Sequence, residues 1–177
     1  MIRWERFNIY LLLTLAAVAA CGCHSTGEKK SKKLLSTLRL HLEATRDSPK
    51  ASERIPVYRD NPVWLTVEKE PFLTEGHVST ASVVDVVGGF ALSIQFNRQG
   101  AGVLEEYSVQ NRSRRIAIFS QFGDKILDYR WLAAPVINHR IADGVFVFTP
   151  DATREEAEEI ASGLNNVAKK VSSWIDK

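Results

Sequence analysis

The spacing of apolar residues along the chain predicts a series of short strands. Leu38, Leu40 and Leu42 alternate with polar residues, which is typical of a half-buried strand. The same alternation puts His41 on the polar side of that strand, so we expect it to be a surface residue. Further strands are predicted at 55–59, 63–67, 83–87, 90–96, 115–120, 126–132 and 145–148, with 68–74 as a connection and one short helical turn within 75–82.

Two helices are predicted between and after these strands. The first follows Asn97, a good N-cap residue, and extends to about residue 110. Its buried face is expected to hold Ala101, Leu104 and Tyr107. The second follows Thr153 and Glu156, which have the spacing of a capping box, and its apolar residues recur with a period of about 3.6. Short turns between strands and two amphipathic helices predict an α+β fold, in which an antiparallel sheet carries both helices on one face as a two-layer sandwich.

The start of the chain has the order of a secretory signal. Arg3 and Arg6 precede an apolar run that is too short for a comfortable membrane span of roughly 20 residues. The run ends in Val18-Ala19-Ala20-Cys21, which resembles the lipobox of bacterial lipoproteins. That resemblance implies lipidation of Cys21 and cleavage just before it. Simple secretion after a cut near Ala20, or an uncleaved anchor, is the alternative.

This interpretation divides the chain into three parts. We expect a signal peptide at 1–20, a flexible tether at 21–35 and a single α+β domain at 36–177. The expected location is the bacterial cell envelope, where the lipid anchor holds the domain at a membrane, facing the periplasm or the exterior. Four lysines in the tether either touch anionic lipid headgroups or belong to a solvated linker.

Composition narrows the classes of function. The 23 basic and 21 acidic residues give a formal net charge of +2, which argues against a nucleic-acid binder. Cys21, Cys23 and His24 resemble a short metal-binding tract, but no second ligand pair follows at zinc spacing. No constellation typical of catalysis stands out either, so we expect no enzyme activity, no cofactor and no metal. A pocket with converging ionisable groups would favour an enzyme instead.

Two clusters are candidate contacts for a partner. Tyr129, Arg130 and Trp131 combine aromatic and guanidinium groups, which are enriched where proteins bind one another. Alternation alone leaves open whether Trp131 lies in the core or on the surface. Arg112 and Arg114 form part of a basic cluster, which either holds an acidic partner or belongs to a solvated turn.

The region 88–167 resembles the head of the first large periplasmic domain of SecD, a subunit of the bacterial protein-export machinery. The resemblance is carried, in order, by Gly89-Phe90-Ala91-Leu92-Ser93-Ile94-Gln95-Phe96, Gly100-Ala101, Arg115-Ile116-Ala117-Ile118, Gly123-Asp124-Lys125-Ile126-Leu127, Ala134-Pro135-Val136-Ile137-Asn138, Ile141, Gly144, Thr153-Arg154-Glu155-Glu156-Ala157, Ile160-Ala161 and Leu164. These motifs are explained by strands, turns and a capped helix, so they indicate a fold more than a reaction.

The resemblance implies a ferredoxin-like α+β head that contacts translocating chains. The sequence departs from SecD because it shows none of SecD's membrane helices and no base domain of the expected length. We therefore expect a non-enzymatic, membrane-tethered module that binds a protein partner or an extended polypeptide and is linked to protein export. A free sheet edge that accepts an added strand would provide such binding. The alternative is a structural or assembly subunit of an envelope complex without its own ligand.

Overall fold

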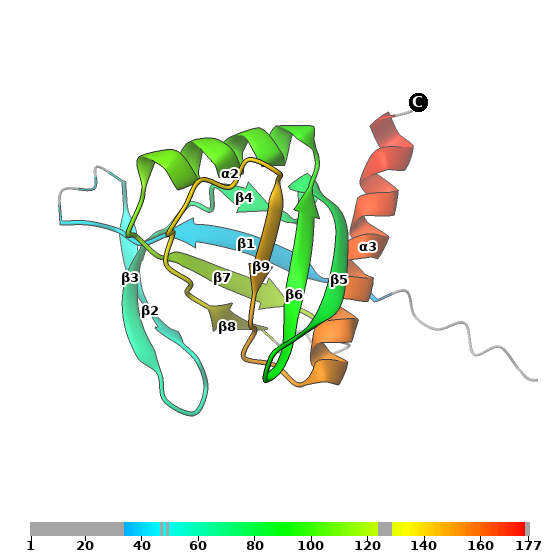
Figure 1. Cartoon of the computed structure of the whole chain (residues 1–177), viewed down its shortest axis with the longest axis horizontal. Coiled ribbons are helices and arrows are strands. Elements are labelled where there is room, and N and C mark those ends of the chain that lie inside the picture. Colours follow the sequence, from blue (N-terminus) through cyan, green and yellow to red (C-terminus); the bar gives the residue numbers. More distant parts are fainter. Residues whose placement is uncertain (1–33, 47, 49, 124–128, 176–177) are drawn as a thin grey trace, which may run out of the picture. The chain divides into compact units, whose positions relative to one another are not determined.

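The strands of the described region form three antiparallel sheets instead of the single predicted sheet. The structure is a computed structural model, and it describes residues 34–46, 48, 50–123 and 129–175. Within that region a four-stranded sheet has the order β4-β1-β7-β8, a two-stranded hairpin pairs β2 with β3, and a three-stranded sheet has the order β5-β6-β9 (Figure 1). The strands are β1 (Thr37–Leu42), β2 (Ser52–Val57), β3 (Val63–Glu68), β4 (Leu73–Thr74), β5 (Val78–Val86), β6 (Gly89–Phe96), β7 (Ile116–Gln121), β8 (Tyr129–Ala133) and β9 (Val145–Phe148).

Both predicted helices begin at the predicted caps. Helix α2 (Arg98–Gln110) starts after Asn97, whose side chain accepts a hydrogen bond from the Gly100 N–H at 2.9 Å. Helix α3 (Arg154–Ile175) starts with the capping box: the Thr153 hydroxyl accepts from the Glu156 N–H at 3.2 Å, and the Glu156 carboxylate accepts from the Thr153 N–H at 2.8 Å. These bonds satisfy amide donors that a helix start otherwise leaves open.

The predicted packing of both helices on one face of a single sheet is not confirmed, because the strands form three sheets. Helix α3 packs along β5 and also reaches β1, so it contacts two of the sheets. Helix α2 contacts β4 and β6 and lies across the top of Figure 1. The mixed α+β class, with antiparallel sheets and two helices, is confirmed for the described residues. A period-two pattern shows which face of a strand is apolar but not which strands pair, and the division into sheets depends on the pairing.

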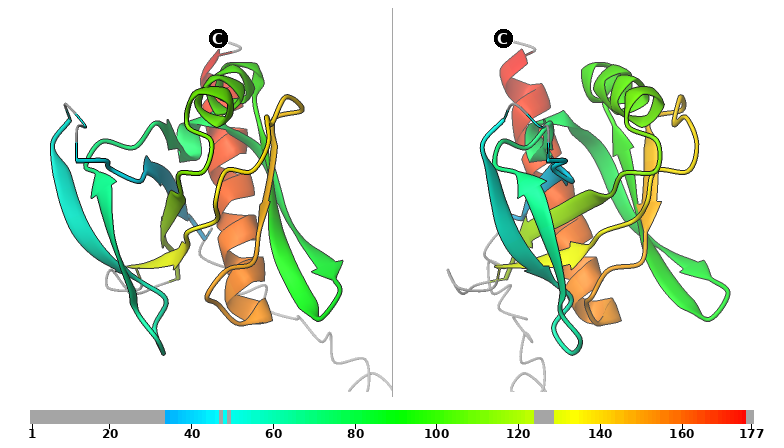
Figure 2. Two further views of the ribbon diagram at one scale, coloured as in Figure 1. Left: turned by 60° about the vertical axis from the view of Figure 1, so that its left-hand side comes forward. Right: turned by 90° about the vertical axis from the view of Figure 1, so that its left-hand side faces the viewer.

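One main core joins the four-stranded sheet, the three-stranded sheet and both helices. Its fully buried side chains come from every one of these elements, among them Leu38, Leu40, Leu73, Leu92, Ile94, Leu104, Ile118, Leu132, Ile160 and Leu164. The hairpin β2–β3 lies beside the other face of the four-stranded sheet (Figure 2) and encloses a second, smaller core there. Both faces of the four-stranded sheet are therefore covered in part.

Several predicted boundaries need correction, among them the strand predicted at 55–59, which is β2 at Ser52–Val57. The turn within 75–82 is a short 3₁₀ helix, η1 (Glu75–His77), and β5 begins directly after it at Val78. The predicted connection 68–74 contains β4, which pairs with β1. The returning strand β8 begins at Tyr129 among the described residues, and the predicted start at Ile126 lies outside them. The first half of β5 was not predicted because Ser79, Thr80 and Ser82 interrupt its apolar pattern. Pairing with β6 and packing against α3 hold it in place.

The predicted signal peptide at 1–20 and most of the tether at 21–35 lie outside the described residues, and so does Cys21. None of the described helices combines the length and the hydropathy needed to cross a membrane.

Candidate functional site

Trp131 lies in the second core, which answers the question that alternation left open. The apolar side of the hairpin, formed by Ile55, Val57, Leu65 and Val67, packs with Ala117 of β7, and Trp131 is half-buried against this cluster. The Trp131 ring meets the Phe119 ring edge-on, with centroids 5.3 Å apart. Trp131 therefore anchors the hairpin to the sheet and still shows part of its surface.

His41 is buried, contrary to the prediction of a surface residue. It does lie on the face of β1 opposite the leucines, but the hairpin covers that face and leaves the residue only 5% exposed. Its Nδ1 lies 2.9 Å from the Glu68 carbonyl, and its ring meets Trp131 edge-on at 5.1 Å. Burial lowers the pKa of His41, although the hydrogen bond to Glu68 acts in the opposite direction.

Arg114 is engaged inside the protein. Its Nε donates to the Glu43 carbonyl at 3.0 Å, and its Nη2 lies 3.4 Å from the buried Glu68 carboxylate. Lys50 approaches the same carboxylate at 2.9 Å. Burial tends to raise the pKa of Glu68, but the bonds from Lys50 and Arg114 hold it below its usual value. Arg114 thus ties the start of β7 to β1 and β3, and we leave it out of the site described below.

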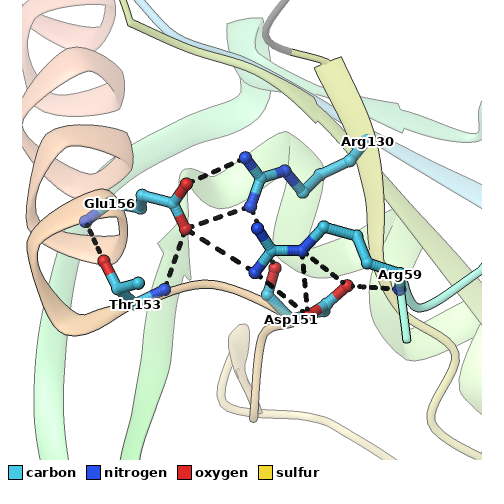
Figure 3. Close-up of polar contacts among 5 residues, drawn as sticks. All are labelled: Arg59, Arg130, Asp151, Thr153 and Glu156. Atoms are coloured by element: carbon cyan, nitrogen blue, oxygen red, sulfur yellow. Dashed lines mark hydrogen bonds and ion pairs between the residues drawn. The ribbon is translucent and has the colours of Figure 1, made fainter. Parts of the chain in front are cut away.

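Arg130 joins a network of charged groups at the start of α3 (Figure 3). Its guanidinium donates two hydrogen bonds to the Glu156 carboxylate, of 3.0 and 2.8 Å. Arg59 of the hairpin turn donates its backbone N–H to Asp151 at 2.7 Å and places its guanidinium 3.3 Å from the same carboxylate. The network therefore connects the hairpin, β8 and α3.

The charges of this network compensate one another. Burial tends to raise the pKa of Glu156, but bonds from Arg130 and from the Thr153 N–H, with the charge of Arg59, keep it below its usual value. Each guanidinium therefore faces a carboxylate, Arg130 that of Glu156 and Arg59 that of Asp151. Sequence reasoning missed Arg59 and Asp151, which are 92 positions apart, and only the hairpin turn brings them together.

A first hollow lies beside this network, between the hairpin turn and β8. It has a volume of about 300 Å³ and is lined by Pro56, Tyr58, Arg59, Pro62, Tyr129, Arg130 and Trp131. All three residues of the predicted aromatic cluster therefore border one cavity. Tyr58 starts the hairpin turn with φ of 70°, a backbone conformation that is uncommon for a bulky residue and that directs the chain out of β2.

Two further hollows share lining residues with the first one or with each other. The second, of about 470 Å³, shares Tyr58 with the first and is otherwise lined by Val86, Ala91, Ala133, Pro135, Val147, Phe148 and Thr149. The third, of about 530 Å³, shares Pro135 and Val147 with the second and extends along residues 136–146. Because each hollow shares lining residues with the next, we treat them as one groove and call it the β8–β9 groove. Its hollows are in the size range of ligand pockets, roughly 300–1,000 Å³.

One wall of the β8–β9 groove is a sheet edge. Strand β9 pairs with β6 on one side, and its other side is the edge of the three-stranded sheet. Phe146 and Phe148 point into the core, whereas Val147 is 50% exposed. The strand carries neither lysine nor proline, two devices by which proteins blunt an exposed edge.

The opposite edge of that sheet is closed at its centre. The Asn165 side chain of α3 accepts from the Ala81 N–H of β5 and donates to the Ala81 carbonyl, both at 2.8 Å. The amide thus takes the place of a neighbouring strand. No comparable side chain pairs with the β9 edge within the described ranges, apart from Asp143, which accepts from the Val145 N–H at 3.0 Å.

Arg112 lies near the far end of the groove. It is exposed, and its guanidinium donates to the carbonyl of Asn138, a residue that lines the third hollow. The structure therefore separates the predicted contact residues: Tyr129, Arg130 and Trp131 border the first hollow, Arg112 lies near the third, and Arg114 is engaged elsewhere. No sequence signal had joined these positions, because the hairpin turn that completes the first hollow is far from β8 along the chain. Nor do the described residues group three side chains suited to holding a metal ion.

The antiparallel sheets and the two capped helices define a mixed α+β domain with a groove beside an open strand edge. The model of the SecDF P1 head subdomain matches residues 52–168. The chain belongs to this family. The match begins well before the predicted region at 88 and includes the hairpin, so the β2–β3 wall of the groove is part of the family fold.

Known relatives agree with this assignment. The SecD subunit of the protein translocase from Aquifex aeolicus is 33% identical over 104 residues, which are 58% of this chain and 19% of that protein. The SecDF subunit from Thermus thermophilus is 37% identical over 97 residues, or 54% of this chain and 12% of that protein. The chain therefore spans a fifth or less of the length of these relatives.

Two solved structures of SecDF share the fold. The super-membrane-facing form has a TM-score of 0.54 and 23% identity, with 74% of this chain and 19% of that chain covered. A second structure, of a membrane component SecDF that enhances protein export, has a TM-score of 0.52 and 22% identity, with coverage of 76% and 64%. At this identity the similarity describes the fold alone.

Proposed function

We propose that this chain is a non-enzymatic lipoprotein of the bacterial cell envelope whose head domain binds a protein partner or an extended polypeptide during protein export. The observation that carries this proposal is the β8–β9 groove, a mostly apolar groove beside an open strand edge in a domain whose relatives are translocase subunits. Peptide-binding domains commonly combine an open edge with neighbouring side-chain pockets.

The groove supports binding more than bond-breaking. Its guanidinium groups are paired with carboxylates: Arg59 with Asp151, Arg130 with Glu156, and Arg140 with Glu105. A catalytic acid or base needs a pKa near the working pH. Glu156 is instead held ionised by its neighbours, so its role in this proposal is to position Arg130.

The lipid anchor is the second part of the proposal, and it rests on the sequence Val18-Ala19-Ala20-Cys21. Acyl chains contribute about 0.8 kcal/mol per buried methylene, so more than one chain holds a protein stably at a bilayer. Intact-mass analysis of the native protein should find residue 21 as an acylated N-terminus. An unmodified thiol at Cys21, or a retained leader, would contradict the anchor and leave the groove untouched.

Binding can be tested with a permanently unfolded reporter protein, reduced and alkylated, titrated against the full chain in detergent. We expect the unfolded reporter to bind and its folded, disulfide-intact form not to bind. Val136 is 42% exposed in the third hollow, so Val136→Asp should weaken binding roughly tenfold by placing a charge in an apolar site. Val87→Asp, at a fully exposed turn outside the groove, is the matched control and should bind like the parent chain. Equal binding of folded and unfolded reporter would overturn the proposal.

A second candidate function is supported by the outer face of the hairpin. Trp64 is 56% exposed there, with the Arg54 guanidinium 5.0 Å from its ring centroid. An exposed tryptophan beside an arginine is typical of a protein interface. If the chain is an assembly subunit, Trp64→Ser should release it from an envelope complex on sizing of mild-detergent extracts, while Val136→Asp should not.

A further inference from the structure

The backbone of β9 presents unpaired hydrogen-bonding groups to the groove. The Phe96 N–H donates to the Gly144 carbonyl at 2.9 Å, and the register pairs Phe146 with Ile94 and Phe148 with Leu92. In an antiparallel pair these even positions exchange bonds with the neighbouring strand, so the odd positions point the other way. The N–H and C=O of Val147 and the C=O of Val145 therefore face the groove, and no described group bonds to them.

The facing segment has the same property. The Ile116 N–H donates to the Pro135 carbonyl at 3.0 Å, and the Ile137 N–H donates to the Arg114 carbonyl at 2.8 Å. Val136 lies between these two bonds, so its own N–H and C=O point away from β7. Val136 and Val147 line the same hollow, and both are about half exposed, at 42% and 50%. Free backbone groups therefore border the hollow from two sheet edges.

We propose that an uncharged, extended segment of a polypeptide adds to the three-stranded sheet as a new strand beside β9, with its backbone bonded to Val147 and its alternate side chains in the β8–β9 groove. This inference rests on the proposed function and names the occupant and its mode of binding. Backbone hydrogen bonds of this kind recognise an extended conformation more than a particular sequence. This mode of binding suits a site for chains of varied sequence.

The charges around the groove favour a neutral occupant. The three guanidinium groups that line it are paired with carboxylates, and Arg112 and Asp143, near its far end, have opposite signs. The apolar lining, which includes Ile116, Ile137 and Phe146, penalises a buried charge. Complementarity therefore selects segments with β-branched or small apolar residues at alternate positions.

The shape of the groove argues against a second folded copy. The edge of β9 lies beside the segment 135–143, which forms the other wall of the third hollow. A single extended chain enters such a channel more readily than the edge of another folded sheet. The strand has four residues, so the added strand would pair over about the same length.

The test uses the full chain in detergent and a fluorescent, acetylated and amidated peptide that alternates valine with threonine. A second peptide has the same sequence but carries N-methyl groups on alternate amides. A third peptide carries the same number of methyl groups, each shifted by one residue. Methylation of the amides that face β9 should weaken binding at least tenfold. Each lost hydrogen bond lowers the affinity by up to about tenfold, and methylation removes more than one of them. Methylation of the outward amides should change binding little. A fourth peptide, with aspartate in place of one valine, should also bind more weakly.

A matched pair of variants tests the protein side. The Val147 N–H makes no bond to β6, so Val147→Pro removes one groove-facing donor at a position where an edge strand tolerates proline. It should weaken binding of the unmethylated peptide about tenfold, while Val87→Thr, at the exposed turn outside the groove, is the control and should bind like the parent chain.

The outcomes separate the two proposals. If the unfolded reporter binds but methylation and Val147→Pro have no effect, strand addition at β9 is wrong and the proposed function stands. If neither the reporter nor the peptide binds, both are overturned. A dimer that forms through β9 and disappears in Val147→Pro would also overturn the inference, since the occupant would be a second copy. The methylated peptides keep the test decisive even if Val147→Pro fails to fold.

Discussion

At the scale of single residues, the charged groups near the groove hold the protein together. Arg130 was a candidate contact for a partner, and the structure shows its guanidinium engaged in two bonds with Glu156, with Phe122 below its plane at 4.9 Å. Planar, bidentate pairs of this kind are stronger than single ion pairs on a surface. The exposed aromatic residue of this cluster is Tyr129, which is 58% exposed.

Arg130→Ala should lower the free energy of unfolding by about 1–2 kcal/mol, because Glu156 would lose its two charge-assisted bonds while remaining partly covered. Arg130→Lys should lower the free energy of unfolding by less, since lysine keeps the positive charge but cannot make the two parallel bonds of the guanidinium. Urea denaturation at pH 7 measures both effects. Arg112→Ala is the control and should change the free energy of unfolding by less than about 0.5 kcal/mol. Equal effects of Arg130→Ala and Arg112→Ala would show that the Arg130–Glu156 pair contributes nothing.

His41 should make folding sensitive to mildly acidic pH. Its folded-state pKa is lowered by burial from an unfolded value of about 6.5, so the unfolded chain binds more protons between the two values. Stability is therefore fully present above that unfolded value and declines as the pH falls through the folded pKa. NMR titration should find the folded pKa of His41 below the usual value, and His41→Gln should flatten the decline seen in denaturation curves. A His41 pKa at or above the usual value would contradict the burial argument.

At the scale of elements, local signals predicted the helices and several strands, and nonlocal pairing decided the rest. Helix α3 and strand β9 were predicted from local patterns: a capping box with an apolar period of about 3.6, and a short β-prone run. Asn97 caps α2, as its side-chain chemistry predicts. The buried face of α2 agrees with the prediction at Leu104, which is buried, and at Tyr107, which packs against the core. It differs because Gly100 and Ser108 are buried, whereas Ala101 is only partly so. A close approach to His77 demands a small residue at 100. A side chain at Gly100 would meet the His77 Cβ at 2.8 Å, a contact that no local pattern reveals.

The closed edge of β5 offers a prediction about an element. Asn165→Ala removes both bonds to the Ala81 backbone, so it should lower the free energy of unfolding by about 1–3 kcal/mol and promote self-association through the exposed edge. Asn166→Ala is the neighbouring control, since it removes one bond, to the Leu34 carbonyl at 3.0 Å. Denaturation and sedimentation velocity measure the two effects. If Asn165→Ala stays monomeric and as stable as Asn166→Ala, the side chain does not guard the edge.

At the scale of the whole domain, the candidate site is a product of assembly. The β8–β9 groove takes its walls from the hairpin turn, from β8 with the segment after it, and from β9. Motif reading could interpret Pro135 as the end of a strand and Asp143-Gly144 as a turn. It could not predict that these two breaks border one channel, because their spatial relation depends on the packing of two sheets. Gly144 shows this dependence: its φ is 68°, and a side chain there would meet the Ala101 Cβ of α2 at 2.6 Å.

The hairpin turn forms one wall of the groove, and we call Asp151 its latch because the Asp151 carboxylate ties this turn to the start of α3. The second core and the Asp151 carboxylate, which accepts from the Arg59 backbone and faces its guanidinium, join the hairpin turn to the rest of the domain. Asp151→Ala removes these acceptors, so the hairpin should open more often by local fluctuation. We expect amide hydrogen exchange over 52–68 to accelerate about three- to tenfold, with exchange in α3 little changed. Arg54→Ala, on the outer face of the same hairpin, is the control and should leave exchange as it is. Exchange that rises equally in the hairpin and in α3 would mean that Asp151 stabilises the domain globally and does not act as a latch on this wall.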